Sequence, residues 1–156
     1  EVIDFSESYI YNDQYLIIHK DDADVYTTTD SLIGKKVGAQ KGTVQSQLIM
    51  QAMPQSELFE LAKYPDLAME VLNKNIAGFV VDEEVGAAFV ENQENLVVSS
   101  YTFPEEISKF GKACVVKKGN SDLTEVANTV IARVLADGSF DKAYQEAVEL
   151  AATLGV

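Results

Sequence analysis

The segment at residues 35–49, KKVGAQKGTVQSQLI, combines residue types that can bind an anion. A short apolar strand is followed by Gly42 and then by an amphipathic helix, for which Thr43 is a suitable N-cap. The backbone N–H groups near the helix start, at Thr43, Val44 and Gln45, lack intrahelical acceptors and favour negative charge. The segment therefore predicts a site for a carboxylate or a small anion. A plain strand-to-helix turn with a capped helix start is the alternative.

A second candidate is Asp82, at the end of the apolar segment AGFVVD. In open α/β sheets ligands bind beyond the carboxyl ends of the strands, which is where Asp82 and the turn at Thr43 are both expected. Asp82 alone could equally cap a helix that begins at Glu83. Together, the helix start would accept a carboxylate and Asp82 an ammonium group. The pair is thus complementary to a zwitterion such as a free α-amino acid.

No other pattern indicates catalysis or a cofactor. The phosphate-binding pattern GxxxxGK[ST], the dinucleotide pattern GxGxxG and the metal patterns CxxC and HExxH are absent. The single cysteine, Cys114, is expected to pack as a small apolar residue, and the single histidine, His19, to be structural and away from any partner. Glu83 and Glu84 are adjacent and do not face each other on a helix, so we interpret them as solvated acids. We expect no catalytic residue, no metal and no cofactor.

Composition narrows the class of protein. The chain has 156 residues, 47% of them hydrophobic, which is enough for a folded core. The formal net charge of −13 repels the phosphates of nucleic acids and anionic lipids, so we expect neither as a partner. No apolar run approaches the ~20 residues that a membrane-spanning helix needs.

Hydrophobic periodicity predicts the elements that must position these residues. Apolar segments predict strands at residues 15–19, 35–40, 57–62, 77–82 and 95–100. Helices are expected from residue 44 to Pro54, at residues 66–75 and directly after Asp82. The alternation predicts an α/β fold with a mostly parallel sheet flanked by helices. Residues 101–111 are expected to be mainly a loop, followed by a strand at 112–118 and two helices, with Gly138 at the C-cap of the first.

Four segments occur in an order that resembles a known family: VIDFSESYIYNDQYLIIHKDD, LIGKKVGAQKGTVQSQL, IAGFVVDEEVGAAFV and GKACVVKKGNSDLTEVANTVIARVLADGSFDKAYQE. They resemble the family 3 extracellular solute-binding proteins of amino-acid ABC transporters, which have a periplasmic-binding-protein fold of type II. In that family, two α/β lobes joined by two crossing strands close on the ligand. The resemblance implies a remnant of the first lobe with the outgoing hinge strand at residues 1–18. The second lobe would span 19–112, and 113–156 would contain the return strand and C-terminal helices of the first lobe.

The resemblance also implies site residues and partners. Gln40 would face the cleft, the amides near Thr43 and Val44 would bind an α-carboxylate, and Gln45 would add a contact. Asp82 matches the aspartate that binds the α-ammonium, and Val81 the preceding position that helps to read the ligand side chain. The implied ligand is a free amino acid, with a polar type favoured, and the implied partner is a transporter permease. The expected location is extracellular or periplasmic, with a lipid anchor on a Gram-positive cell.

The sequence also departs from the family pattern. Ser8 replaces the proline of the usual FSEPY segment, and the arginine that clamps the carboxylate belongs to a part of the family sequence upstream of this chain. We therefore expect weak or no binding by this chain alone. We also expect exposed apolar surface around the C-terminal helices, with a homodimer or a domain swap. A sensor domain and an enzyme domain that uses a small anion are the alternative functions.

Overall fold

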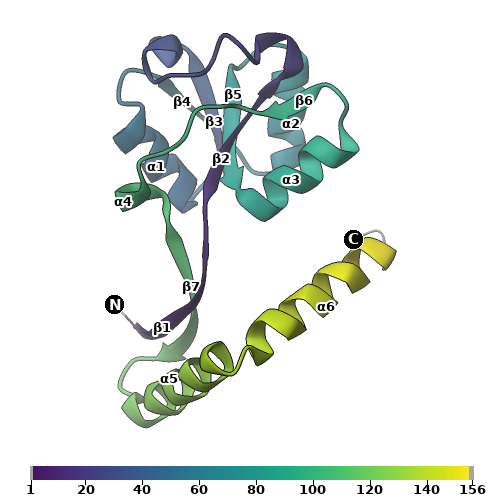
Figure 1. Cartoon of the computed structure of the whole chain (residues 1–156). Helices are drawn as coiled ribbons and strands as arrows, with labels where there is room; N and C mark the ends of the chain where they lie inside the picture. Colours follow the sequence, from purple (N-terminus) through teal and green to yellow (C-terminus); the bar gives the residue numbers. More distant parts are fainter. Residues whose placement is uncertain (1, 155–156) are drawn as a thin grey trace. The chain divides into compact units, whose positions relative to one another are not determined.

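The computed structural model describes the backbone of residues 2–154 and the side chains of residues 2–150 (Figure 1). The chain divides into two compact units. We call residues Asn12–Phe110 the central unit, and Glu1–Tyr11 together with Gly111–Val156 the terminal unit. Each unit is described by itself.

The central unit is built on a five-stranded sheet with the order β4-β3-β5-β2-β6. Its strands are β2 (Gln14–His19), β3 (Lys36–Gln40), β4 (Glu57–Leu61), β5 (Gly78–Asp82) and β6 (Leu96–Val98). Strand β3 is parallel to β4 and β5, whereas β2 is antiparallel to β5 and β6. The α/β class is confirmed, and the sheet is mixed because β2 runs against the other four strands. The mostly parallel sheet is confirmed as well, and β2 is the strand that departs from it.

Helices cover both faces of this sheet. They are α1 (Val44–Ala52), α2 (Tyr64–Leu72), α3 (Glu83–Asn92) and α4 (Glu105–Ser108), with two short 3-10 helices, η1 (Lys20–Asp22) and η2 (Asp30–Leu32). The predicted helices after residues 43, 65 and 82 are confirmed. The segment expected to be mainly a loop contains α4, which contacts α1.

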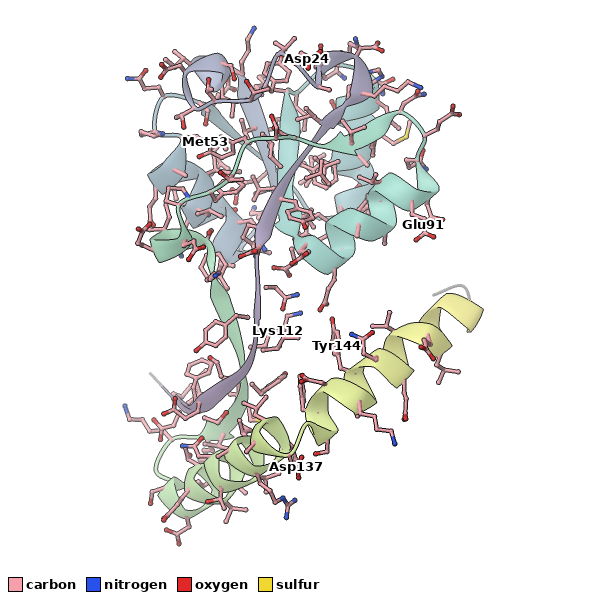
Figure 2. All side chains as sticks on the ribbon, in the orientation of Figure 1. Asp24, Met53, Glu91, Lys112, Asp137 and Tyr144 are labelled. Carbon is pink, nitrogen blue, oxygen red and sulfur yellow. The ribbon has the colours of Figure 1, made fainter. Side chains whose placement is uncertain are left out.

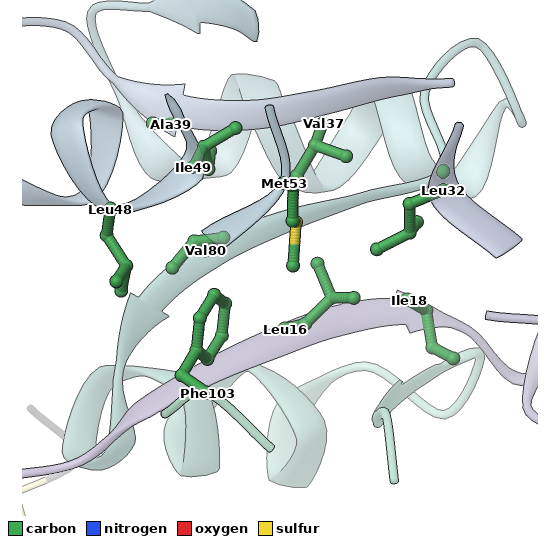
Figure 3. Close-up of a cluster of buried hydrophobic side chains, with 11 residues drawn as sticks. Leu16, Ile18, Leu32, Val37, Ala39, Leu48, Ile49, Met53, Val80 and Phe103 are labelled. Carbon is green, nitrogen blue, oxygen red and sulfur yellow. The ribbon is translucent and has the colours of Figure 1, made fainter. Parts of the chain in front are cut away.

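Alternation along β2 divides the core into two clusters. Leu16 and Ile18 point to the face covered by α1, while Ile17 points to the face covered by α2 and α3, as period-two geometry requires. Figure 3 shows the first cluster, in which the side chain of Met53, directly after α1, points toward Leu16 of β2. Both clusters consist of central-unit residues, and β2 is buried on both faces.

The terminal unit contains a two-stranded sheet and two helices: β1 (Ile3–Asn12), β7 (Phe110–Lys117), α5 (Ser121–Ala136) and α6 (Ser139–Leu154). The strand and the two helices predicted here are confirmed. Gly138 has a φ of 72° just after α5, the left-handed conformation that ends many helices. Asp137 marks this corner between α5 and α6 in Figure 2.

Two expectations about single residues need correction. Cys114 lies on β7 and is exposed, because β7 has only β1 as a partner strand in the described part of the unit. His19, expected to lack a partner, accepts a hydrogen bond at Nδ1 from the Asp21 N–H at 3.1 Å. It therefore caps η1, which is a structural role.

Candidate functional site

The parallel pairing of β3 with β5 places the ends of both strands at one edge of the sheet. Gln40 ends β3 and Asp82 ends β5. After Gln40, the chain turns into α1 through Gly42, whose φ of 79° favours glycine because it has no Cβ. The turn at Thr43 and the carboxylate of Asp82 therefore belong to the same edge, as the sequence predicted.

Thr43 occupies the N-cap position of α1 but does not cap it with its side chain. Its hydroxyl donates to the Gln40 carbonyl at 2.7 Å, and its own N–H makes a long bond of 3.3 Å to the same oxygen. The N–H groups of Val44 and Gln45 lie in the first turn, where no helix carbonyl is available one turn earlier to accept a hydrogen bond. The positive end of the helix dipole is therefore left without a side-chain cap. Of the two residues, Val44 is 44% exposed and Gln45 is 3% exposed.

Asp82 occupies the N-cap position of α3, but its carboxylate does not cap that helix either. Instead, Oδ1 accepts hydrogen bonds from Gln14 Nε2 at 2.7 Å and from Gln45 Nε2 at 3.3 Å. Gln45 Nε2 also donates to Gln14 Oε1 at 2.9 Å. Within the described residues, Oδ2 forms no hydrogen bond. The carboxylate is thus held in place through one oxygen, and the other can accept from a ligand.

Gln14 and Gln45 form the support beneath this carboxylate. They are 4% and 3% exposed, respectively, so their amides are buried and need partners, which they find in each other and in Asp82. Sequence reasoning missed Gln14. The signal was a polar residue at the first position of an apolar strand, and the antiparallel register of β2 then sets it opposite Asp82.

Tyr64, at the start of α2, is a second neighbour that the sequence did not indicate. Burial, and after it the negative charge of Asp82, raise the pKa of the Tyr64 hydroxyl. The ring packs against Phe79 and Phe89, with centroid separations of 6.2 and 6.5 Å. Tyr64 therefore stays neutral at physiological pH and places an aromatic side chain in the field of the carboxylate.

Two expected contact residues, Gln40 and Val81, make contacts within the protein in this structure. The Gln40 side chain is half-buried and donates from Nε2 to the Ala62 carbonyl at 2.8 Å. Val81 is fully buried in the cluster with Ile17 and Phe79. Its part in reading a ligand side chain stays a prediction. It supports Asp82 from within the core.

The described residues contain no group of three or more histidine, cysteine, aspartate or glutamate side chains that could hold a metal ion. Within the same residues, no helix has the length and hydrophobicity that crossing a membrane requires. Glu83, expected to be solvated, accepts a hydrogen bond from the Tyr15 hydroxyl at 2.8 Å. That bond and then burial raise the pKa of Tyr15.

Comparison with known sequences identifies the family. The family model for bacterial extracellular solute-binding proteins, family 3, matches residues 1–149. The chain belongs to this family. Its curated relatives include a putative ABC transporter arginine-binding protein 2 of Escherichia coli, 28% identical over 78% of this chain. Another is the ABC transporter glutamine-binding protein GlnH of Bacillus subtilis, 25% identical over 92% of it.

A solved family structure has the same fold. The substrate-binding protein AbpA of Streptococcus pneumoniae, bound to L-arginine, superposes with a TM-score of 0.82 and 29% identity, over 95% of this chain and 62% of AbpA. These relatives are transporter binding proteins and not enzymes. This chain spans about half the length of the curated relatives that it matches, 50% and 51% of the two named above.

Proposed function

We propose that this chain is part of the substrate-binding component of an ABC importer and contributes one wall of a site for a free amino acid. The observation that carries the proposal is the pairing at one sheet edge of an uncapped helix start and an anchored carboxylate. The N–H groups of Val44 and Gln45 would bind the α-carboxylate, and Asp82 Oδ2 the α-ammonium. The Thr43 hydroxyl and Gln40 would border the carboxylate, with Val81 supporting the floor.

Polar amino acids are the proposed ligand class. The relatives are named for arginine, glutamine and glutamate, and AbpA was solved with L-arginine. Asp82 alone does not select among these, because every α-amino acid carries the ammonium group that it would bind. L-Arginine and L-glutamine are therefore the first ligands to test.

The domain organisation is part of the same proposal. Residues 19–112 would form the second lobe, 1–18 a remnant of the first lobe with the outgoing hinge strand, and 113–156 the return strand with the C-terminal helices of the first lobe. The division of the chain at Asn12 and Phe110 supports this, with the difference that β2 lies in the sheet of the central unit. Lobe closure over the ligand would then be a hinge motion. The partner would be a membrane permease, and the protein would be extracellular or periplasmic, anchored by a lipid on a Gram-positive cell.

We expect weak binding by this chain alone. Small-ligand sites bury most of the ligand surface, whereas the wall described here contacts the zwitterion from one side. Exposed apolar residues on the terminal unit also support a homodimer or domain swap, because large apolar patches mark association sites.

Amide NMR titration tests the site directly. L-Arginine and L-glutamine at millimolar concentration should shift the Thr43, Val44 and Gln45 amides, and agmatine, which lacks the carboxylate, should not. Asp82→Asn keeps an acceptor for Gln14 but removes the charge, and should weaken binding by about tenfold or more. Glu94→Gln, an exposed change before β6 at the other edge of the sheet, is the control. Shifts elsewhere, or binding that Asp82→Asn leaves unchanged, would refute the assignment.

A further inference from the structure

The central unit contains a cavity that the amino-acid site does not use. Its volume is about 370 Å³, within the range of roughly 300–1,000 Å³ that is usual for small-molecule sites. It lies beside the start of β2 and the end of β6, under the segment that leads into α4. The lining residues that matter here are Asp13, Tyr15, Tyr101, Phe103, Glu105 and Ser108.

The lining is aromatic and acidic. Tyr101 and Phe103 pack edge to face, with ring centroids 4.9 Å apart and planes at 82°, which makes a firm corner. Phe103 is 7% exposed and anchors this corner in the first hydrophobic cluster. None of the residues that line the cavity carries a positive charge, whereas Asp13 and Glu105 are negative. Aromatic faces and carboxylates both attract cations.

Ser108 supplies a separate indication that a ligand belongs here. It lies at the end of α4, is 3% exposed and lines the cavity. Its hydroxyl forms no hydrogen bond to any residue that the structure describes, and it is not among the fully buried side-chain oxygens of those residues, so it is open to the cavity. A hydroxyl can accept from an N–H donor, and guanidinium and ammonium groups have donors only.

The two carboxylates are available to a ligand. Glu105 is 79% exposed on its side chain and pairs at 3.4 Å with Lys109, one helical turn further on. Exposed pairs of this kind are weak, so a ligand cation can displace Lys109. The Asp13 backbone carbonyl accepts from the Glu83 N–H at 3.0 Å, which fixes the Asp13 backbone beside the cavity.

We infer that this cavity binds a small organic cation, a guanidinium or ammonium group with a short apolar chain. The cation would lie against the Tyr101–Phe103 corner, between the carboxylates of Asp13 and Glu105, with one N–H donated to Ser108. Gln14 forms the wall toward Asp82, and its amide is already bonded to Gln45 and Asp82. The site is therefore separate from the amino-acid site and does not rest on the function proposed above.

A matched pair of probes tests this inference: n-butylguanidinium and its neutral isostere n-butylurea, titrated into the whole chain with amide NMR. Butylguanidinium should shift the amides of residues 99–108, and butylurea should bind at least fivefold more weakly. Asp13→Asn and Glu105→Gln should each weaken butylguanidinium binding about three- to fivefold. Ser108→Ala should weaken it by a similar factor. Lys109→Gln should instead strengthen it about twofold, because it frees Glu105.

Controls separate a built site from general attraction to an acidic chain. Glu94→Gln removes the same charge as Glu105→Gln, and Lys35→Gln the same charge as Lys109→Gln. Both residues lie near the amino ends of β6 and β3, at the opposite edge of the sheet, and both changes should leave the affinity unchanged. If Glu94→Gln matters as much as Glu105→Gln, or if butylurea binds equally well, the inference is wrong. Absence of shifts at residues 99–108 would equally overturn it.

Discussion

At the scale of single residues, the carboxylate of Asp82 depends on two buried glutamines. The carboxylate is half-buried, and the hydrogen bonds from Gln14 and Gln45 replace water at Oδ1 and fix the orientation of the side chain. The arrangement also explains why Asp82 does not cap α3, although it stands at the N-cap position. Its side chain faces the glutamines, which leaves Oδ2 available to a ligand.

Replacing Gln14 should reveal this dependence. Gln14→Leu keeps most of the volume but leaves the Gln45 amide and Asp82 Oδ1 with fewer partners. We expect a loss of about 1–3 kcal/mol in the free energy of unfolding, since buried groups would be left unsatisfied. Urea unfolding measures it. Gln51→Ala, on the exposed side of α1, should change stability by less than about 0.5 kcal/mol, and an equal effect of both would contradict the account.

The sequence predicted part of this site and missed the rest for identifiable reasons. Thr43 and Asp82 could be placed at strand ends because apolar segments with turn residues after them mark such ends. Gln14 could not be predicted, since its importance depends on the pairing of β2 with β5, which the local sequence does not encode. The burial of Val81, in contrast, agrees with an apolar segment that lacks polar alternation, and α3, which follows it in the chain, covers the side chain.

At the scale of elements, local patterns predicted most helices and strands and a mostly parallel sheet, but not the direction of β2. The helix from Val44 to Ala52 ends just before Pro54 as expected, because its N-cap and terminator are local signals. The direction of β2 has no local signal, because apolar strands buried on both faces look alike in parallel and antiparallel pairs. Only the pairing of Ile17 with Phe79 and with Val98 reveals it.

The backbone just after α2 is strained at Lys74, and substitutions can test this strain. The Lys74 N–H bonds to the Val71 carbonyl and the Asn75 N–H to the Glu70 carbonyl, both at 2.9 Å, which is the Schellman arrangement. Lys74 takes the left-handed position with a φ of 57°, where glycine is usual. The Lys74 Nζ forms an ion pair with Asp21 Oδ2 at 3.1 Å, which connects the end of α2 to η1 and offsets part of the backbone strain.

Lys74→Ala and Lys74→Gly separate the strain from the ion pair. Both remove the contact with Asp21, but only glycine relieves the backbone, so the glycine variant should be more stable than the alanine variant by about 1 kcal/mol. Urea unfolding at neutral pH gives the difference. Equal stabilities would show that the left-handed position is not strained.

The pH dependence gives an independent check on the ion pair. The hydrogen bond and charge of Lys74 lower the pKa of Asp21 below its ordinary 3.8, and Asp21 raises the pKa of Lys74 above 10.5. A carboxyl group whose pKa is lower in the folded state stabilises the fold at pH values above its unfolded-state pKa. This stabilisation is lost as the pH falls through the folded-state pKa. The stability of Lys74→Gly relative to the parent should therefore rise below pH 3.8. A constant difference would contradict a contribution from the pair.

At the scale of the whole molecule, the two units differ in the size of the sheet and of the hydrophobic core that each contains. The central unit is one continuous segment, and both hydrophobic clusters consist of its residues alone. The terminal unit has a two-stranded sheet, and ribbons of two strands are marginal without further packing. On α5, Leu123, Val126 and Val130 are 55%, 59% and 42% exposed at helical spacing, so they form an apolar stripe.

A fragment of residues 12–110 tests whether the central unit folds alone and whether the apolar stripe on α5 mediates association. We expect it to fold cooperatively and to stay monomeric, because it keeps the complete sheet and both clusters and removes the stripe on α5. The whole chain should self-associate with rising concentration in light scattering. Val126→Gln with Val130→Gln should reduce that association, and Val25→Gln, a change at a 51% exposed valine of the central unit, should not. An unfolded fragment would show that the central unit needs the terminal one. Association that persists in the fragment, or a whole chain that remains monomeric, would instead show that the stripe on α5 is not a contact surface.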